Sequence, residues 1–251
     1  MIWIRGFALA LLLPAAASAQ DTLSLSLPVA CEIGRACVVQ NYVDQRPGPG
    51  ARDYRCGFLS YDGHKGTDIR VVDSAAFRRG VAVVAAAPGR VRAVRDGMPD
   101  VSVRTAGKEA VAGREAGNSV VIEHGDGWET QYAHLRKGSV AVRAGDTVQG
   151  GQTLGMVGLS GHTEFPHLHI EVRHRGRIVD PFLGEEAGEA CAPGRNPLWR
   201  GSDLEALAYV ATGLLDAGIA GAAPVLTDGA VDRSRTAGFD SAAAAAVFWV
   251  Q

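Results

Sequence analysis

Glycine spacing constrains the fold of this chain more than any other feature. From Gly57 to about Gly184, short apolar runs such as VAVVAAA and SVVIEHG are separated by glycine-containing turns, without a convincing amphipathic helix. Short runs rich in Val and Ile between such turns are typical of strands joined by hairpins. We therefore predict a mainly β fold, an antiparallel sheet of barrel-sandwich type over residues 57–184, followed by a partly helical C-terminal extension.

One predicted strand carries two histidines. The stretch FPHLHIEV occupies residues 165–172. Successive side chains of a strand point to opposite faces, so His167, His169 and Glu171 share one face and the aliphatic residues between them pack into the core. An H-x-H pair is by itself a weak indication of a site, because such pairs are commonly exposed or hydrogen bonded.

A second motif supplies the residue types of a metal site. The stretch YDGHKGTDIR contains His64 and Asp68 in H-x-x-x-D spacing, and Gly63 and Gly66 allow the backbone to turn tightly. Imidazole nitrogen and carboxylate oxygen are both normal zinc ligands. Two ligands from this motif and one from H-x-H leave the fourth tetrahedral position for water, which is the arrangement of catalytic zinc.

A third motif, QYAHL at residues 131–135, follows an apparent hairpin at HGDGW. Strand alternation puts Tyr132 and His134 on one face, and Ala133 and Leu135 on the other. We therefore expect His134 to project into the same cavity as the metal ligands. Tyr132 is expected either to line that cavity or to be a packed aromatic.

The order H-x-x-x-D, Y-x-H-L and H-L-H-x-E resembles the signature of lysostaphin-like, or LytM-type, zinc endopeptidases, which cut peptidoglycan peptides. The glycine-rich run VRAGDTVQGGQTLGMVGLSG is similar to another segment of that family, and the resemblance covers about residues 57–183. It implies an exported peptidase that hydrolyses peptidoglycan cross-links, with the peptide stems as its partner.

The resemblance also implies roles for individual residues. One zinc ion is expected to be held by His64, Asp68 and His169, while His134 and His167 lie beside the metal-activated water. Which of these two histidines is the general base stays open. Asn118 is similar to an asparagine that the family places near its substrate groove, and a substrate contact by His162 is an alternative to an ordinary loop position.

Two other function classes compete with the enzyme. The family includes members that have lost zinc ligands and act as amidase activators, so a non-catalytic wall-binding or amidase-regulating module is the alternative; the intact motifs favour the hydrolase. A biotinyl- or lipoyl-like carrier would need a lysine at the hairpin tip, where the sequence has Val148-Gln149-Gly150-Gly151. The net charge of -2 shows no basic excess of the kind that nucleic-acid binding requires.

The N-terminus indicates export. Residues 1–19 combine Arg5, an apolar stretch of about 12 residues and the small-residue pattern Ala17-Ser18-Ala19, which together predict a signal peptide cleaved before Gln20. Neither a lipidation cysteine after the cleavage site nor a later transmembrane segment is expected. We predict a periplasmic or extracellular location, with the oligomeric state left open.

Four cysteines in an exported chain favour disulfides. Three pairings are open, of which we favour Cys31–Cys37 as a local clip and Cys56–Cys191 as a long-range link. A zinc ribbon is the rival interpretation, but the sequence has no C-x-x-C pair.

The flanks are less constrained. Residues 20–56 are predicted to form a strand and loop segment, and residues 185–251 a C-terminal extension with a helix capped by Ser202 and ending near Gly218. The extension ends on the apolar run 242–250, which fits either a truncated form or a buried C-terminal strand. The segment 96–117 is long for a hairpin connection. Its role, as a lid over the substrate groove or as a wall of that groove, stays open. His124 is expected in a turn and His174 on the surface.

Overall fold

The computed structural model describes residues 23–72, 74–186, 190–212, 217–222, 226–227, 230–231 and 247–250. The predicted signal peptide lies outside these residues. Within the described part, no helix is long and apolar enough to cross a membrane.

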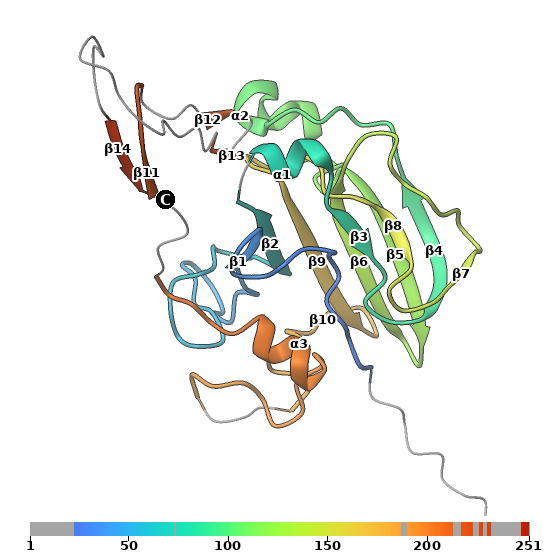
Figure 1. The fold of residues 1–251 in the computed structure, drawn as a ribbon. Helices are drawn as coiled ribbons and strands as arrows, with labels where there is room; N and C mark the ends of the chain where they lie inside the picture. Colours follow the sequence, from blue (N-terminus) through green and yellow to red (C-terminus); the bar gives the residue numbers. More distant parts are fainter. Residues whose placement is uncertain are drawn as a thin grey trace, which may run out of the picture.

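The largest element is an antiparallel sheet, as predicted (Figure 1). Its strands lie in the order β1 (Cys37–Asn41), β2 (Thr67–Val71), β9 (His167–His174), β6 (Trp128–Leu135), β5 (Asn118–Gly125), β4 (Gly89–Arg95) and β7 (Thr147–Val148), and β10 (Arg177–Ile178) pairs with β9 outside this path. The two histidine-bearing strands, β9 and β6, are therefore neighbours. Strand β2, which carries Asp68, flanks β9 on its other side.

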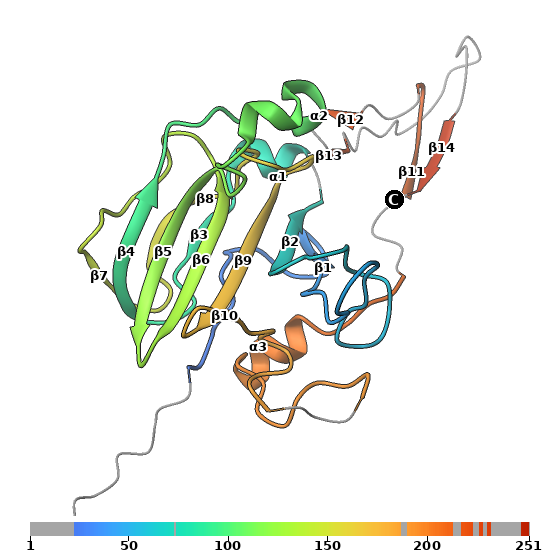
Figure 2. The same ribbon diagram turned by 180° about the vertical axis from the view of Figure 1, so that it is seen from behind.

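A smaller pair of strands packs against this sheet. Strands β3 (Ala82–Val84) and β8 (Thr153–Met156) pair with each other and form a second layer over the sheet (Figures 1 and 2). Tyr132 is fully buried in the core, and its hydroxyl oxygen accepts a hydrogen bond from the Ala86 N–H at 2.7 Å. Tyr132 is therefore a packed aromatic and does not line the cavity, because its one polar atom is satisfied inside.

The N-terminal and C-terminal segments join the same core. The Leu25 N–H donates to the Leu198 carbonyl at 2.7 Å, and the Arg200 N–H donates back to the Leu25 carbonyl at 2.9 Å. Both favoured disulfides are present, Cys31–Cys37 and Cys56–Cys191, with Cα–Cα distances of 6.2 and 4.9 Å. The second spans 135 residues, and closing so long a loop stabilises the fold by about 5 kcal/mol in the chain-entropy model.

The C-terminal helix is shorter than predicted. Helix α3 (Gly201–Ala206) begins after Arg200, so Ser202 lies inside it and does not cap it. Beyond the helix, Tyr209 packs in a cluster of aromatic rings, and its hydroxyl donates to Asp53 at 2.9 Å. Gly218, expected near the helix end, lies in β11 (Ala217–Ala220).

The remaining elements are short. They are α1 (Ser74–Arg79), α2 (Val103–Ala106), the 3₁₀ helix η1 (Lys108–Val111), and the strands β12 (Leu226–Thr227), β13 (Ala230–Val231) and β14 (Val247–Val250). Strand β14 is the described part of the terminal apolar run and pairs with β11, but Phe248 on it is exposed.

Two histidine predictions were wrong. His174 is buried, because its ring stacks on Trp128 with 4.2 Å between centroids. His124 lies within β5, where its nitrogens bond the Pro88 carbonyl at 2.7 Å and the Thr130 hydroxyl at 2.8 Å. In both cases a tertiary partner holds a side chain that the local sequence placed in a turn or on the surface.

A buried carboxyl gives a stability prediction. Burial raises the pKa of Asp180 to about 7, although the Phe182 N–H donates to its side chain. The unfolded chain releases this proton near pH 4 but the folded chain keeps it to higher pH, so between pH 5 and 7 the contribution of Asp180 to stability falls as pH rises. Asp180→Asn should remove up to about 1.4 kcal/mol per pH unit of this slope.

Denaturant unfolding at pH 5, 6 and 7, with the disulfides oxidised, measures the effect. The free energy of unfolding of Asp180→Asn should rise relative to the parent protein as pH increases. Glu109→Gln alters an exposed carboxyl of η1 and should leave the slope unchanged. Parallel curves for Asp180→Asn and the parent protein would rule out the raised pKa.

Candidate metal centre and active site

The register of β2 against β9 brings together two of the three predicted metal ligands, Asp68 and His169. Asp68 pairs directly with His169 across the two antiparallel strands. Directly opposed residues have Cβ atoms about 4.5–5.5 Å apart and share a face. The Asp68 Oδ1 and His169 Nδ1 atoms are 2.8 Å apart.

His64 reaches the same point from the turn before β2, where Gly63 has a φ of +73°. Its Nε2 lies 3.2 Å from Asp68 Oδ1 and 3.2 Å from His169 Nδ1. The His64 Nδ1–H donates to the Tyr42 carbonyl at 2.7 Å. Because a carbonyl oxygen only accepts, this bond fixes the proton on Nδ1 and leaves the Nε2 lone pair facing the cluster.

These three donor atoms fit a zinc ion. Their separations of 2.8–3.2 Å are close to the ~3.3 Å between neighbouring ligand atoms around a tetrahedral ion with bonds of about 2.0–2.1 Å. A second group, His134, His167 and His169, also has donor atoms within 4.8 Å of one another. Only the first group contains a carboxylate, which offsets the charge of a dication in a buried site.

Asp68 is a buried anion surrounded by imidazoles. Burial would raise its pKa, but the facing His167, and hydrogen bonds from His167, His169 and His64, hold it well below its usual range. His169 responds in the opposite direction: burial alone would lower its pKa, but Asp68 and then Glu171 raise it to about 9. The cluster is therefore built to hold positive charge next to Asp68.

His134 enters the cavity by a route that alternation did not predict. Ala133 already lines the cavity, and Tyr132 is in the core, so a regular strand would turn the next side chain away. Between β5 and β6 the register shifts, so that Ala133 and His134 oppose a single residue, and His134 adopts a φ of +61°. This β-bulge turns the imidazole into the cavity at a strain cost of about 1–3 kcal/mol.

His134 and His167 present the same ring nitrogen to the cavity. The His134 Nδ1–H donates to the Ser160 carbonyl at 2.8 Å, and the His167 Nδ1–H donates to the Phe165 carbonyl at 2.9 Å. In each ring Nε2 is therefore the nitrogen left for the site. The His167 Nε2 lies 3.5 Å from Asp68 Oδ1, and the His134 and His167 ring centroids are 4.7 Å apart.

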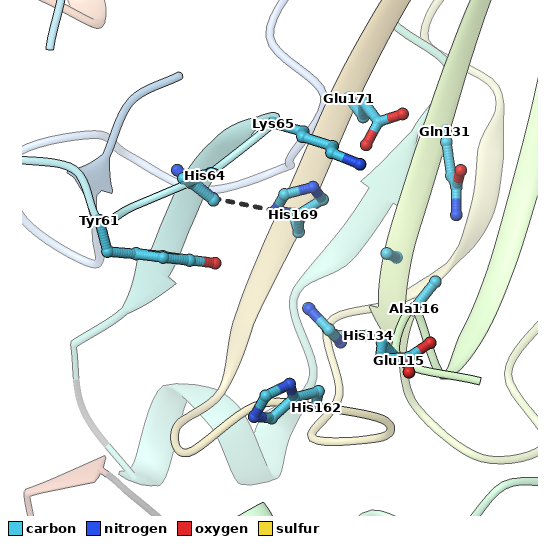
Figure 3. Close-up of a pocket in the computed structure, with 12 residues that line it drawn as sticks. Tyr61, His64, Lys65, Glu115, Ala116, Gln131, His134, His162, His169 and Glu171 are labelled. Atoms are coloured by element: carbon cyan, nitrogen blue, oxygen red, sulfur yellow. Dashed lines mark hydrogen bonds between the residues drawn. The ribbon is translucent and has the colours of Figure 1, made fainter. Parts of the chain in front are cut away.

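Two adjoining cavities surround these groups, with volumes of about 320 and 410 Å³. Tyr61, His134 and His162 line both. Figure 3 shows Tyr61 reaching into the first cavity from the His64 side, with His134 and His162 facing it. His162 therefore lines both cavities, and a substrate contact by it stays a prediction.

The first cavity has charged residues that we did not predict as site residues. Lys65, Glu115 and Glu171 line it, on three different segments (Figure 3). Glu171 could have been found from the sequence, because it shares the strand face of His169. The positions of Lys65 and Glu115 depend on loop conformation and leave no comparable signal.

The segment 96–117 forms a wall of the site. The Val103 N–H donates to the Thr163 carbonyl at 2.9 Å, and Arg104 makes an ion pair with Glu164 at 2.6 Å. Asn118, at the end of this segment, is fully buried and lines neither cavity. Its side chain bonds the Met98 backbone, and a place for Asn118 near the substrate groove stays a prediction.

Comparisons with known proteins point to one family. Residues 62–181 match peptidase family M23. The DD-carboxypeptidase/endopeptidase Mpg of Neisseria meningitidis is 41% identical over 91 residues, 36% of this chain and 19% of the relative. The peptidoglycan DD-endopeptidase ShyA of Vibrio cholerae is 46% identical over 65 residues, 26% of this chain and 15% of the relative.

The chain thus spans less than a fifth of the length of these two relatives. Among solved structures, the catalytic domain of the prophage-encoded protein EnpA from Enterococcus faecalis is 25% identical, with a TM-score of 0.40. That alignment covers 58% of this chain and 88% of the other.

Gly66 gives a prediction for the metal centre. A Cβ at this position would lie 2.6 Å from the His169 ring and 2.6 Å from the Ile170 carbonyl. Gly66→Ala must therefore displace His169, a predicted zinc ligand, and we expect zinc affinity to fall by at least about tenfold, the lower end of what perturbed ligand orientation costs. Competition with a chromophoric chelator measures it.

The control is Gly201→Ala, because nothing lies within 4 Å of a Cβ there. Zinc affinity of Gly66→Ala equal to that of the control would show that His169 is not a ligand.

Proposed function

Residues 62–181 are a domain of peptidase family M23, and from this premise we propose that the protein is an exported, zinc-dependent endopeptidase that hydrolyses peptide cross-links of peptidoglycan. The observation that carries the proposal is the meeting of His64, Asp68 and His169 at one point, with two further imidazoles beside it. Export is supported by the sequence pattern of residues 1–19.

His64, Asp68 and His169 would hold the zinc ion, with three protein ligands as in other catalytic sites. When bound, zinc supplies Lewis acidity toward the scissile carbonyl and lowers the pKa of water at its open position toward about 7. The protein itself must then bind the peptide, accept a proton from water and stabilise the oxyanion.

His134 is the better placed proton acceptor. Its Nδ1–H is engaged by the Ser160 carbonyl, so the neutral ring offers an Nε2 lone pair to water in the groove. Burial, and then the neighbouring His167 and His169, lower the pKa of His134 well below its ordinary value, which keeps the ring neutral.

His167 is suited to the complementary role. Its Nε2 faces the site and lies 3.5 Å from Asp68 Oδ1. A protonated imidazole can donate a hydrogen bond to the developing oxyanion. We assign proton abstraction to His134 and oxyanion stabilisation to His167.

The groove and the relatives support a polymeric peptide substrate. Two adjoining cavities that share His134 provide space for chain on both sides of a scissile bond. Two relatives are named as a DD-carboxypeptidase/endopeptidase and a peptidoglycan DD-endopeptidase. We therefore propose a peptide cross-link of the cell wall as the substrate class.

Histidine variants test the assignment of roles. His169→Ala should lose the zinc ion. His134→Ala and His167→Ala should keep most of it but lose about 10²–10⁴-fold in turnover, because removing a general acid–base group has effects of this size. The measurements are zinc content by mass spectrometry and mass analysis of muropeptides released from purified peptidoglycan.

The matched control is His124→Ala, whose imidazole is bonded to the Pro88 carbonyl and the Thr130 hydroxyl and lines neither cavity. It should retain both zinc and turnover. Equal zinc loss in the His167 and His169 variants would overturn the division of roles. A zinc-loaded parent protein that releases no muropeptides would instead indicate a non-catalytic module on the same fold.

A further inference from the structure

We propose that Asn118 and Ser160 are positioning residues that hold His134 in the left-handed conformation through which it enters the cavity. The inference rests on the proposed role of His134 in turnover. Neither residue touches the three metal ligands in the hydrogen bonds of the described chain, so their effect is on proton transfer and not on metal binding.

Ser160 holds His134 from two directions. Its carbonyl accepts the His134 Nδ1–H at 2.8 Å, which fixes the ring. Its hydroxyl donates to the Leu135 carbonyl at 2.7 Å, which fixes the backbone immediately after the bulge. The same hydroxyl accepts the Asn118 N–H at 2.9 Å, so it both donates and accepts a hydrogen bond in a site without solvent exposure.

Asn118 completes the clamp and connects it to the wall. Its side-chain N–H groups donate to the Leu135 carbonyl at 3.0 Å and to the Met98 carbonyl at 2.9 Å. Its side-chain oxygen accepts the Met98 N–H at 2.8 Å. The Leu135 carbonyl therefore receives two donors, and the start of the 96–117 segment is tied to the strand that bears His134.

The clamp is needed because the His134 conformation is strained. A non-glycine residue with a positive φ persists only where its surroundings fix it. The loops that carry Ser160 and Glu115 also approach each other closely here: a Cβ on Gly117 would lie 2.4 Å from the Ser160 carbonyl oxygen, and one on Gly161 would lie 2.3 Å from the Glu115 carbonyl oxygen. If the clamp is removed, relaxation of His134 toward ordinary strand geometry turns its ring away from the cavity.

Ser160→Ala and Asn118→Ala test the inference directly. We expect kcat to fall about 10–100-fold with KM within about twofold, because misplacing a catalytic group by about 1 Å costs up to about 10²-fold in rate. Zinc stoichiometry should stay at one per chain. Ser160→Thr keeps the hydroxyl and should recover most of the lost turnover.

Ser139→Ala is the matched control. The Ser139 hydroxyl also donates to a carbonyl, that of Arg136 at 2.8 Å, and accepts a backbone N–H, that of Met156 at 3.0 Å. It bridges the end of β6 to β8 without bonding His134, so its removal should leave turnover unchanged.

A double-mutant cycle separates positioning from general damage. In a His134→Ala background, Ser160→Ala should cause no further loss of turnover, because the residue that it positions is already gone. A further loss by the same factor, or loss of zinc in either clamp variant, would overturn the proposal.

One readout does not depend on activity. Imidazole ¹⁵N spectra of the parent protein should show the His134 proton on Nδ1. Ser160→Ala keeps the carbonyl that accepts this proton but removes the hydroxyl that holds the backbone after His134, so the ring should move away from the carbonyl and its signal should shift toward a mixture of tautomers. An unchanged His134 signal in Ser160→Ala would contradict the clamp, even if the parent protein proves inactive and only the proposed function fails.

Discussion

The buried carboxylate of Asp68 is the constraint around which the site is built. An isolated anion in a protein interior is strongly unfavourable, so it must be surrounded by donors or cations. Here one carboxylate oxygen, Asp68 Oδ1, has three imidazole nitrogens within 3.5 Å, one each from His64, His167 and His169. The same geometry that stabilises the anion leaves a point between the donors that a dication can occupy.

Parts of the chain outside the family match contribute to this centre. The proton on His64 is fixed by the carbonyl of Tyr42, which precedes the matched residues 62–181. The Tyr42 ring in turn packs against Tyr54, Phe182 and Tyr209, with centroid distances of 5.1–5.4 Å. The Cys56–Cys191 disulfide links the two flanking segments covalently. The flanking segments therefore support the His64 side chain and also add to the core.

The sequence predicted the features that depend on the alternation of side chains along a strand or on the pairing of cysteines. The aliphatic face of β9 and its histidine face follow from the two-residue period, and the disulfide pairing agrees with the structure. The local sequence pattern did not predict conformations that tertiary contacts determine. Tyr209 lies beyond the end of helix α3 and bonds Asp53, and His174 is buried because it stacks on Trp128. His134 was placed in the cavity for a reason that proved wrong, since a bulge and not alternation puts it there.

Whether a single zinc ion lies between His64, Asp68 and His169 is the most direct question. Anomalous diffraction at the zinc edge from crystals of the zinc-loaded protein answers it. The account predicts one peak within about 2.0–2.2 Å of His64 Nε2, Asp68 Oδ1 and His169 Nδ1. A peak held instead by His134, His167 and His169, or the absence of any peak near Asp68, would contradict it.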